Sequence, residues 1–265
     1  MPEQAAARII FIGDVVGQAG RQALFAALPK LRERYDPTFV VVNAENAAAG
    51  LGLTPKLADQ LFAAGIDVIT LGNHAYHRPE IIPYLDTQPR LLRPANFLSS
   101  HPGRGWCTVE GAGGVTLGVV NLLGNLFMEA AYPAFEQAAK AVAALGEADH
   151  VLIDFHAEAT SEKVALGWYL DGRVTAVVGT HTHVPTADSR ILPGGTAYIT
   201  DVGMTGSRAS VIGFDRTRSI ARLVSQLPTR LEPATEDPCV MGVAIGAASR
   251  RRAEWIEPFS FPADA

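Results

Sequence analysis

The sequence predicts an α/β fold, and three observations lead to this prediction. Short apolar runs rich in β-branched residues recur along the chain, segments with helical periodicity separate them, and most runs close on Gly, Asn, Asp or His. Strands that alternate with helices are typical of a mostly parallel sheet. The 265 residues are 48% hydrophobic and 18% charged, so they can bury a large core. We therefore expect one globular domain over residues 1–265.

The first third of the chain predicts three strands and two helices. The apolar runs that predict strands are 8–12, 39–42 and 67–71. The spacing of leucine and phenylalanine over 22–34 predicts the first helix. Thr54 followed by Pro55 is a typical helix start, and Gly65 is a typical helix end, so the second helix should lie between them.

The rest of the chain predicts a hairpin, followed by a return to alternating helices and strands. Residues 106–110 and 115–121 flank Gly-Ala-Gly-Gly, which favours a hairpin over a crossover. Further helices are expected at 134–145, 161–170 and 217–223, and further strands at 150–155, 174–178, 197–200 and 239–245. Residues 203–213 contain several glycines and predict a loop.

Charge, cysteine content and the N-terminal segment exclude several classes of protein. The formal net charge is −5 and the longest basic run is Arg250 to Arg252, which disfavours a long nucleic acid as partner. Two cysteines far apart in sequence give neither a disulfide scaffold nor a thiolate metal cluster, so we expect a reducing, cytoplasmic location. The sequence has neither a secretion signal nor the roughly 18 apolar residues of a membrane span.

Potential metal ligands follow five of the predicted strands. They are carboxylates, carboxamides and imidazoles without sulfur: Asp14, Glu45, Asn46, Asn73, His74, His156, His181 and His183. Because ligands of α/β sheets bind beyond the carboxyl ends of the strands, we expect these side chains to converge. Hard oxygen and borderline nitrogen donors together suit Mn, Fe or Zn. Two carboxylates and three imidazoles suffice for two cations if one carboxylate bridges them.

Each of these residues also has a purely structural interpretation. Asp14 is suited to cap a helix, residues 43–46 to form an Asx turn, residues 72–74 to form a tight turn, and His156 to fill the core. The pair His181 and His183 is the strongest single element, because alternate residues of an extended segment face the same side. All structural interpretations would have to hold together at equivalent strand ends, so the sequence favours a metal centre.

Several motifs occur in the order used by the calcineurin-like metallophosphoesterases, and the sequence resembles that superfamily. They are Gly13-Asp14, Gly72-Asn73-His74, a strand-end His156 and Gly179-Thr180-His181-Thr182-His183. Longer stretches such as LGNHAYHRPEI, DFHAEATSEK and TDVGMTGSRASVIGFD resemble the YmdB-like branch of bacterial phosphodiesterases. The resemblance implies a four-layer αββα sandwich and a dinuclear centre. It also implies hydrolysis of phosphodiesters, such as 2′,3′- or 3′,5′-cyclic nucleotides, by a metal-activated hydroxide.

The resemblance also implies two sets of ligands that share Glu45 as the bridge. One metal would be bound by Asp14, Glu45, Asn46 and His183, and the other by Glu45, Asn73, His156 and His181. The chain departs from the superfamily where the usual Asp-x-His is Asp14-Val15-Val16 and where the bridging residue is Glu rather than Asp. The Asn46 carboxamide makes its site harder. We therefore expect two divalent or mixed-valence ions, with Fe and Mn favoured over Zn.

His74 is the predicted catalytic residue, because it lies next to the ligand Asn73 and can protonate or stabilise the leaving alkoxide. Two alternatives to a phosphodiesterase stay open: a phosphatase acting on monoesters, and a metal-containing regulatory protein that binds RNA or a partner. A pure binder gains nothing from a general acid. The expected partner is a small phosphodiester substrate, a cyclic nucleotide among the candidates. Homo-oligomerisation is left open.

Two further segments have open interpretations. The loop 203–213 either lines the substrate pocket or is an ordinary surface loop. The apolar cluster within 126–132 is a lid, a subunit contact or part of the core.

Overall fold

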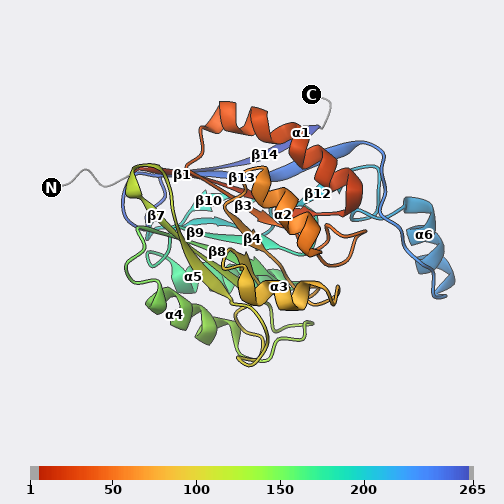
Figure 1. Cartoon of the computed structure of the whole chain (residues 1–265), viewed down its shortest axis with the longest axis horizontal. Coiled ribbons are helices and arrows are strands. Elements are labelled where there is room, and N and C mark those ends of the chain that lie inside the picture. Colours follow the sequence, from red (N-terminus) through yellow and green to blue (C-terminus); the bar gives the residue numbers. More distant parts are fainter. Residues whose placement is uncertain (1–5, 263–265) are drawn as a thin grey trace.

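Two β-sheets pack face to face in the computed structural model, which describes residues 6–262 (Figure 1). The first sheet has the strand order β2-β12-β13-β1-β3-β4-β5, with β14 also paired to β13. Its strands are β1 (Ala7–Ile12), β2 (Asp14–Val15), β3 (Phe39–Asn43), β4 (Val68–Thr70), β5 (Leu91–Leu92), β12 (Met204–Ser207), β13 (Pro238–Ala247) and β14 (Trp255–Pro262). Strands β1, β3, β4 and β5 run parallel, so their carboxyl ends lie at one edge.

The second sheet has the strand order β10-β11-β9-β8-β7-β6. Its strands are β6 (Trp106–Glu110), β7 (Thr116–Leu123), β8 (His150–His156), β9 (Ala176–Thr180), β10 (Arg190–Ile191) and β11 (Ala197–Ile199). The predicted hairpin is confirmed, because β6 and β7 are antiparallel, with the short 3-10 turn η1 (Ala112–Gly114) between them. Strands β7, β8, β9 and β11 are parallel to one another.

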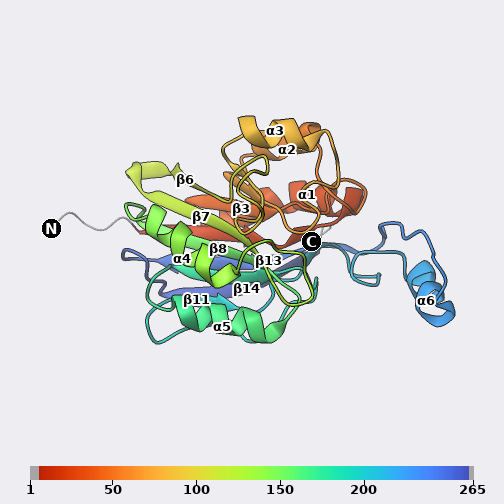
Figure 2. The ribbon, with the colours of Figure 1, turned by 90° about the horizontal axis from the view of Figure 1, so that it is seen from below.

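Alternation of side chains along the strands produces the layers. On β1, Ile9 and Phe11 belong to the core between the sheets, whereas Ile10 and Ile12 pack beneath the outer helices. The helices are α1 (Gly17–Tyr35), α2 (Pro55–Ala63), α3 (Ile81–Thr87), α4 (Ala134–Ala144), α5 (Thr160–Leu170) and α6 (Arg216–Ser225). Helices α1 to α3 cover the first sheet, α4 and α5 cover the second, and α6 projects from the body (Figure 2). The predicted four-layer αββα sandwich is confirmed.

Local sequence signals predict some ends of helices and strands correctly and fail to predict others. Thr54 caps α2 as predicted, because its hydroxyl accepts a hydrogen bond from the Leu57 amide at 3.3 Å. The loop prediction for 203–213 is wrong in part, since 204–207 form β12. That short segment gains strand geometry only by pairing with β2 and β13. Helix α1 begins at Gly17 rather than at residue 22, and α3 and β14 were not predicted.

Within residues 6–262, no helix combines the length and the apolar character needed to cross a bilayer. Both cysteines are free and buried. The organisation of residues 1–265 as one domain stays a prediction.

Candidate metal centre

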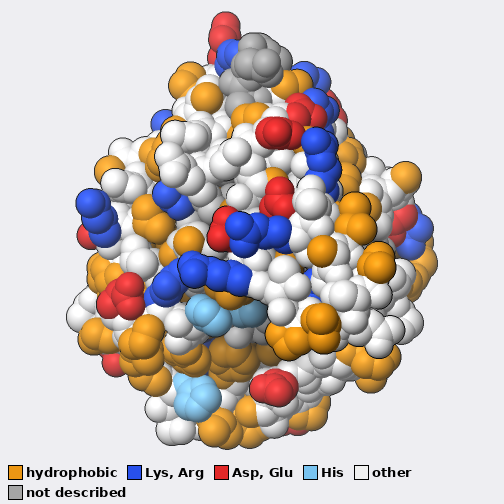
Figure 3. Space-filling view, turned by 90° about the vertical axis from the view of Figure 1, so that its right-hand side faces the viewer, with side chains coloured by type: hydrophobic (Ala, Val, Ile, Leu, Met, Phe, Trp, Pro, Cys, Tyr) orange, Lys and Arg blue, Asp and Glu red, His pale blue; other side chains and the backbone are white. Residues whose placement is uncertain are grey.

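The predicted ligands lie where strands of both sheets end. In the first sheet, Asp14 begins β2 with one residue between it and the end of β1, Glu45 and Asn46 follow β3, and Asn73 follows β4. In the second sheet, His156 ends β8, and His181 and His183 follow β9. The structure brings all seven side chains into one connected cluster. Figure 3 shows histidine side chains in a hollow on the corresponding face of the molecule.

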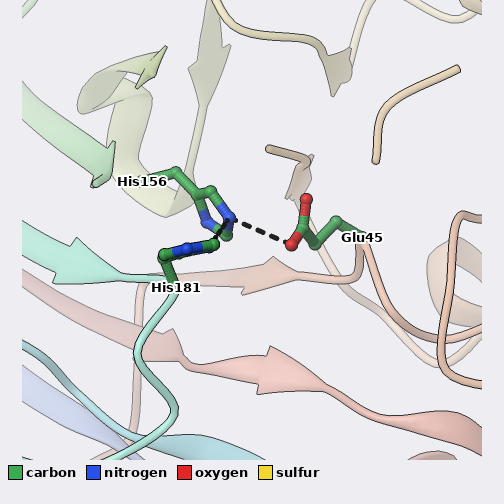
Figure 4. A group of neighbouring side chains, drawn as sticks. All are labelled: Glu45, His156 and His181. Atoms are coloured by element: carbon green, nitrogen blue, oxygen red, sulfur yellow. Dashed lines mark hydrogen bonds and ion pairs between the residues drawn. The ribbon is translucent and has the colours of Figure 1, made fainter. Parts of the chain in front are cut away.

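Three ligand atoms surround one nitrogen of His156. Its Nε2 lies 3.0 Å from Glu45 Oε1, 3.0 Å from His181 Nδ1 and 3.1 Å from Asn73 Oδ1. Figure 4 shows Glu45, His156 and His181 pointing toward one another. One ring nitrogen carries at most one proton, and that proton cannot satisfy three acceptors. A cation shared by these atoms satisfies all of them at once.

The other ring nitrogen of His156 is held so that, whenever the ring is neutral, Nε2 carries the lone pair that a metal ion needs. Thr180 donates its hydroxyl proton to Asp154 Oδ1 at 2.7 Å, so its oxygen must accept from His156 Nδ1 at 2.9 Å. Asp154 is fully buried and also accepts hydrogen bonds from Thr70 and Asn43. A carboxylate behind a histidine in this way is typical of metal sites.

A second group of ligand atoms gathers around His183 and Asp14. The carbonyl oxygen of Ile212 can only accept, so His183 Nδ1 donates to it at 2.8 Å, and in the neutral tautomer Nε2 carries the lone pair. This Nε2 lies 3.3 Å from the Asn46 amide and 3.8 Å from Asp14 Oδ1. Rotating the Asn46 side-chain amide by 180° would place its oxygen where its nitrogen now lies, beside His183 Nε2.

Asp14 provides an independent test of whether these residues fit a metal ion. Its side chain is fully buried, and Oδ1 has no hydrogen-bond partner among the described residues. A buried carboxylate oxygen without a partner is costly, whereas a cation beside it removes that cost. Gly72 keeps the space open, because a Cβ there would lie 2.5 Å from both Glu45 Oε2 and His156 Nε2. The residues therefore fit a bound cation.

The electrostatics of the cluster also favour positive charge. Burial disfavours a charged imidazole, but the carboxylates of Glu45 and Asp14 outweigh it and raise the pKa of His156 to about 9. Burial and the neighbouring His156 lower the pKa of His181 to about 3. The cluster thus favours one positive charge at His156 and a neutral imidazole at His181, and a metal ion supplies positive charge while keeping both imidazoles neutral.

The segment that carries His181 and His183 has an unusual backbone. Its φ angles are +96° at His181 and +66° at His183, a region that residues other than glycine rarely occupy. Asp201 holds the segment, because its Oδ2 accepts from the Thr182 amide at 3.2 Å and from the Thr182 hydroxyl at 2.7 Å. Lys163 Nζ lies 2.8 Å from the same oxygen, and both side chains are 1% exposed.

Asp201 and Lys163 were not predicted from the sequence as part of the site. Thirty-eight positions separate them in the chain, and neither lies in a motif with ligand spacing. The only available signal was that each belongs to a stretch carrying the family resemblance, TDVGMTGSRASVIGFD for Asp201 and DFHAEATSEK for Lys163.

We predict that Lys163→Met destabilises the protein by about 3 to 5 kcal/mol, because removing one partner leaves the buried Asp201 carboxylate without its counter-charge. Urea unfolding measures the loss. Lys140→Met is the matched control, since its pair with Glu136 is 58% exposed on both sides and should contribute less than about 1 kcal/mol. Equal effects of the two variants would contradict the role given to the buried pair.

Two cavities open beside the cluster and share His74, Glu158 and His181 as lining residues. The first, which we name the aromatic cavity, has about 510 Å³ and is lined by Asn73, His74, Phe97, Leu123, Phe127, Met128, Glu129, Glu158 and His181. The second has about 270 Å³ and includes Asn46, His183 and Ile212. Ile212 brings part of the predicted 203–213 loop to the pocket.

His74 lies between these cavities and is anchored to Glu45. Its backbone amide donates to Glu45 Oε2 at 3.0 Å, and its side chain lines both cavities. Burial lowers the pKa of His74. A neutral imidazole still donates one N–H, which suits the stabilisation of a leaving oxygen.

Known proteins share this fold and sequence over nearly the whole chain. A family model described as YmdB-like protein matches residues 10–259. A 2′,3′-cyclic-nucleotide 2′-phosphodiesterase of Bacillus subtilis (strain 168) is 50% identical over 239 residues, which cover 90% of either chain. A solved structure of a hypothetical protein from Thermus thermophilus has 39% identity and a TM-score of 0.90, covering 96% of this chain and 99% of that one. A phosphatase structure from Mycoplasma pneumoniae has 34% identity and a TM-score of 0.90, covering 98% and 94%.

The two-sheet fold and these relatives define a phosphoric ester hydrolase of the metallophosphoesterase type, so the predicted fold class and class of enzyme are confirmed. The chain belongs to the YmdB-like family, and the resemblance found in its motifs is confirmed.

Proposed function

We propose that the chain is a metal-dependent phosphodiesterase whose substrates are small phosphodiesters such as 2′,3′- or 3′,5′-cyclic nucleotides. The observation that carries the proposal is the convergence of Glu45, Asn73 and His181 on one nitrogen of His156. The similarity to the Bacillus subtilis enzyme supports the phosphodiester as substrate. The buried free cysteines are compatible with a reducing compartment, and a cytoplasmic location is part of the proposal.

The residues present have distinct roles in this proposal. Asp14, Asn46 and His183 would hold one cation, Asn73, His156 and His181 the other, and Glu45 both. When bound, two cations would polarise the phosphoryl oxygens and make a water molecule nucleophilic near neutral pH. His74 donates its N–H toward the leaving oxygen. Thr180 and Asp154 keep His156 in the tautomer that binds metal.

We expect about two transition-metal ions per chain, with Fe and Mn ahead of Zn, because oxygen donors outnumber imidazoles in the cluster and it contains no sulfur. Elemental analysis of untagged protein purified without chelators measures the content. One ion or none per chain would contradict the dinuclear centre.

A substrate panel tests the activity itself. Chelator-treated protein, with and without restored Mn, is assayed on 2′,3′-cyclic nucleotides, 3′,5′-cyclic nucleotides and phosphomonoesters. The proposal requires metal-dependent hydrolysis of at least one cyclic nucleotide. Activity restricted to monoesters would favour the phosphatase alternative, and activity that persists without metal would reject the metal-dependent mechanism.

A further inference from the structure

The aromatic cavity beside the metal centre has a lining suited to a flat, uncharged group rather than to a phosphate. Phe97, Phe127 and Met128 provide apolar surface, and Glu129 and Glu158 provide carboxylates. No lysine or arginine is among the described residues that line it. We propose that this cavity binds the nucleobase of the substrate, with Phe127 as the stacking surface. The inference rests on the phosphodiesterase function proposed above and names the part of the substrate that this cavity recognises.

Phe127 is the most unusual residue of the cavity. It is 89% exposed, and its φ of +64° is unfavourable for a residue that is not glycine. A strained backbone at a residue other than glycine costs free energy and is found most often at ligand-binding sites. The sequence allows the apolar cluster within 126–132 to be a lid, a subunit contact or part of the core. The exposure of Phe127 excludes a place in the core for this residue. A base stacked on the ring would cover this surface.

Hydrogen bonds hold both ends of the loop that carries Phe127, so the backbone that presents the ring is anchored. The Asn125 amide donates to the Glu162 carboxylate at 2.8 Å. The Asn125 side chain accepts from the Ala134 amide at 2.8 Å and donates to the Tyr132 carbonyl at 3.1 Å. A surface fixed in advance loses less entropy when a ligand stacks on it.

Phe97 is fixed by other aromatic rings. Its ring centroid lies 5.7 Å from that of Tyr76 and 6.1 Å from that of His101. The cavity therefore combines one ring packed into the protein with one ring free to receive a partner. Stacking on aromatic side chains is a common way in which proteins bind bases.

Charge and size determine which part of the substrate enters. Glu129 lines only the aromatic cavity and repels a phosphate there, so the phosphoryl group is kept at the cluster of His74 and His181, which opens into the same cavity. Glu158 lines both cavities and its Oε2 lies 3.2 Å from His181 Nε2, so it does not distinguish them. The aromatic cavity, at about 510 Å³, falls within the range of roughly 300 to 1,000 Å³ that is usual for small-molecule sites. The second cavity, at about 270 Å³, falls below that range. The base is therefore assigned to the aromatic cavity.

The test compares two substrates of the Mn-loaded enzyme. One is adenosine 2′,3′-cyclic phosphate, and the other is methyl riboside 2′,3′-cyclic phosphate, which lacks the base. Phe127→Ala should raise KM for the adenosine substrate about tenfold or more and leave KM for the base-free substrate unchanged. Phe127→Trp should restore the affinity. Trp168→Ala, which removes another half-exposed ring on α5, is the matched control and should change neither KM.

Two kinetic results would overturn the inference: an equal rise in KM for both substrates, or no change with either. If the wild type hydrolyses neither cyclic phosphate, 2′,3′-cyclic phosphates are not its substrates, and the proposed function is decided by the 3′,5′-cyclic nucleotides of the substrate panel. The base cavity is then decided by calorimetry with adenosine 2′-monophosphate. Weaker binding to Phe127→Ala than to the wild type supports the cavity, and equal binding rejects it.

Discussion

Replacing Glu45 by alanine is expected to remove both metal ions and to reduce phosphodiesterase activity to background. The Glu45 carboxylate is 1% exposed, and its two oxygens contact His156 Nε2 and the His74 amide at 3.0 Å each. As the ligand common to both proposed positions it would neutralise charge at each cation. Both ions depend on it, and added Mn should not restore the rate. Bound metal per chain and diesterase rate are measured together.

Asn46→Ala is the matched comparison for this variant. Asn46 contacts His183 Nε2 at 3.3 Å and is a neutral ligand to one ion only, so the His156 and His181 position should stay occupied. About one ion per chain and a partial rescue by Mn are expected. If Glu45→Ala retains two ions, Glu45 does not bridge. If Asn46→Ala matches the wild type in metal content and rate, Asn46 is a structural residue and six protein ligands remain.

His74→Ala is expected to lower kcat by about 10²-fold or more while metal content stays at the wild-type value. A positioned imidazole that donates a proton or a hydrogen bond to the leaving oxygen contributes roughly 10²- to 10⁴-fold. The Glu45 contact comes from the His74 backbone, so it survives the substitution. Steady-state kinetics and elemental analysis are made on the same preparation.

His77→Ala provides the control for His74. The two rings meet edge to face with centroids 5.5 Å apart, but His77 is exposed and lines neither cavity. Its removal should change kcat less than about threefold, a loss of under 1 kcal/mol. If His74→Ala loses metal, His74 belongs in the coordination shell rather than beside the leaving group.

Much of the fold could be predicted because local signals agree with the final packing. The strands β1, β3 and β8 each contain a run of at least three consecutive apolar residues, and both faces of each contact a core. The missed strand β14 depends on long-range pairing. Strand β14 contains Pro258, which is tolerated because β14 pairs only with β13 at the edge of the sheet.

The placement of the candidate ligands could be predicted for a similar reason. Each follows a strand, and the parallel strands of both sheets end on the same side, so topology alone brings Glu45, Asn73 and His156 together. The residues that support the ligands could not be predicted from the sequence. Asp201 and Lys163 matter only because they meet in the fold, and the strained backbone of His181 leaves no trace in the residue types of its segment.

The ligand cluster also connects the two β-sheets, because its residues come from both of them. Glu45 and Asn73 are attached to the first sheet, and His156 and His181 to the second, so an ion bound between them is a non-covalent cross-link across the inter-sheet core. If the proposed ions bind there, metal loading and the association of the sheets would be thermodynamically linked, and each would favour the other. Cellular metal supply would in this way govern the lifetime of the folded protein as well as its rate of turnover.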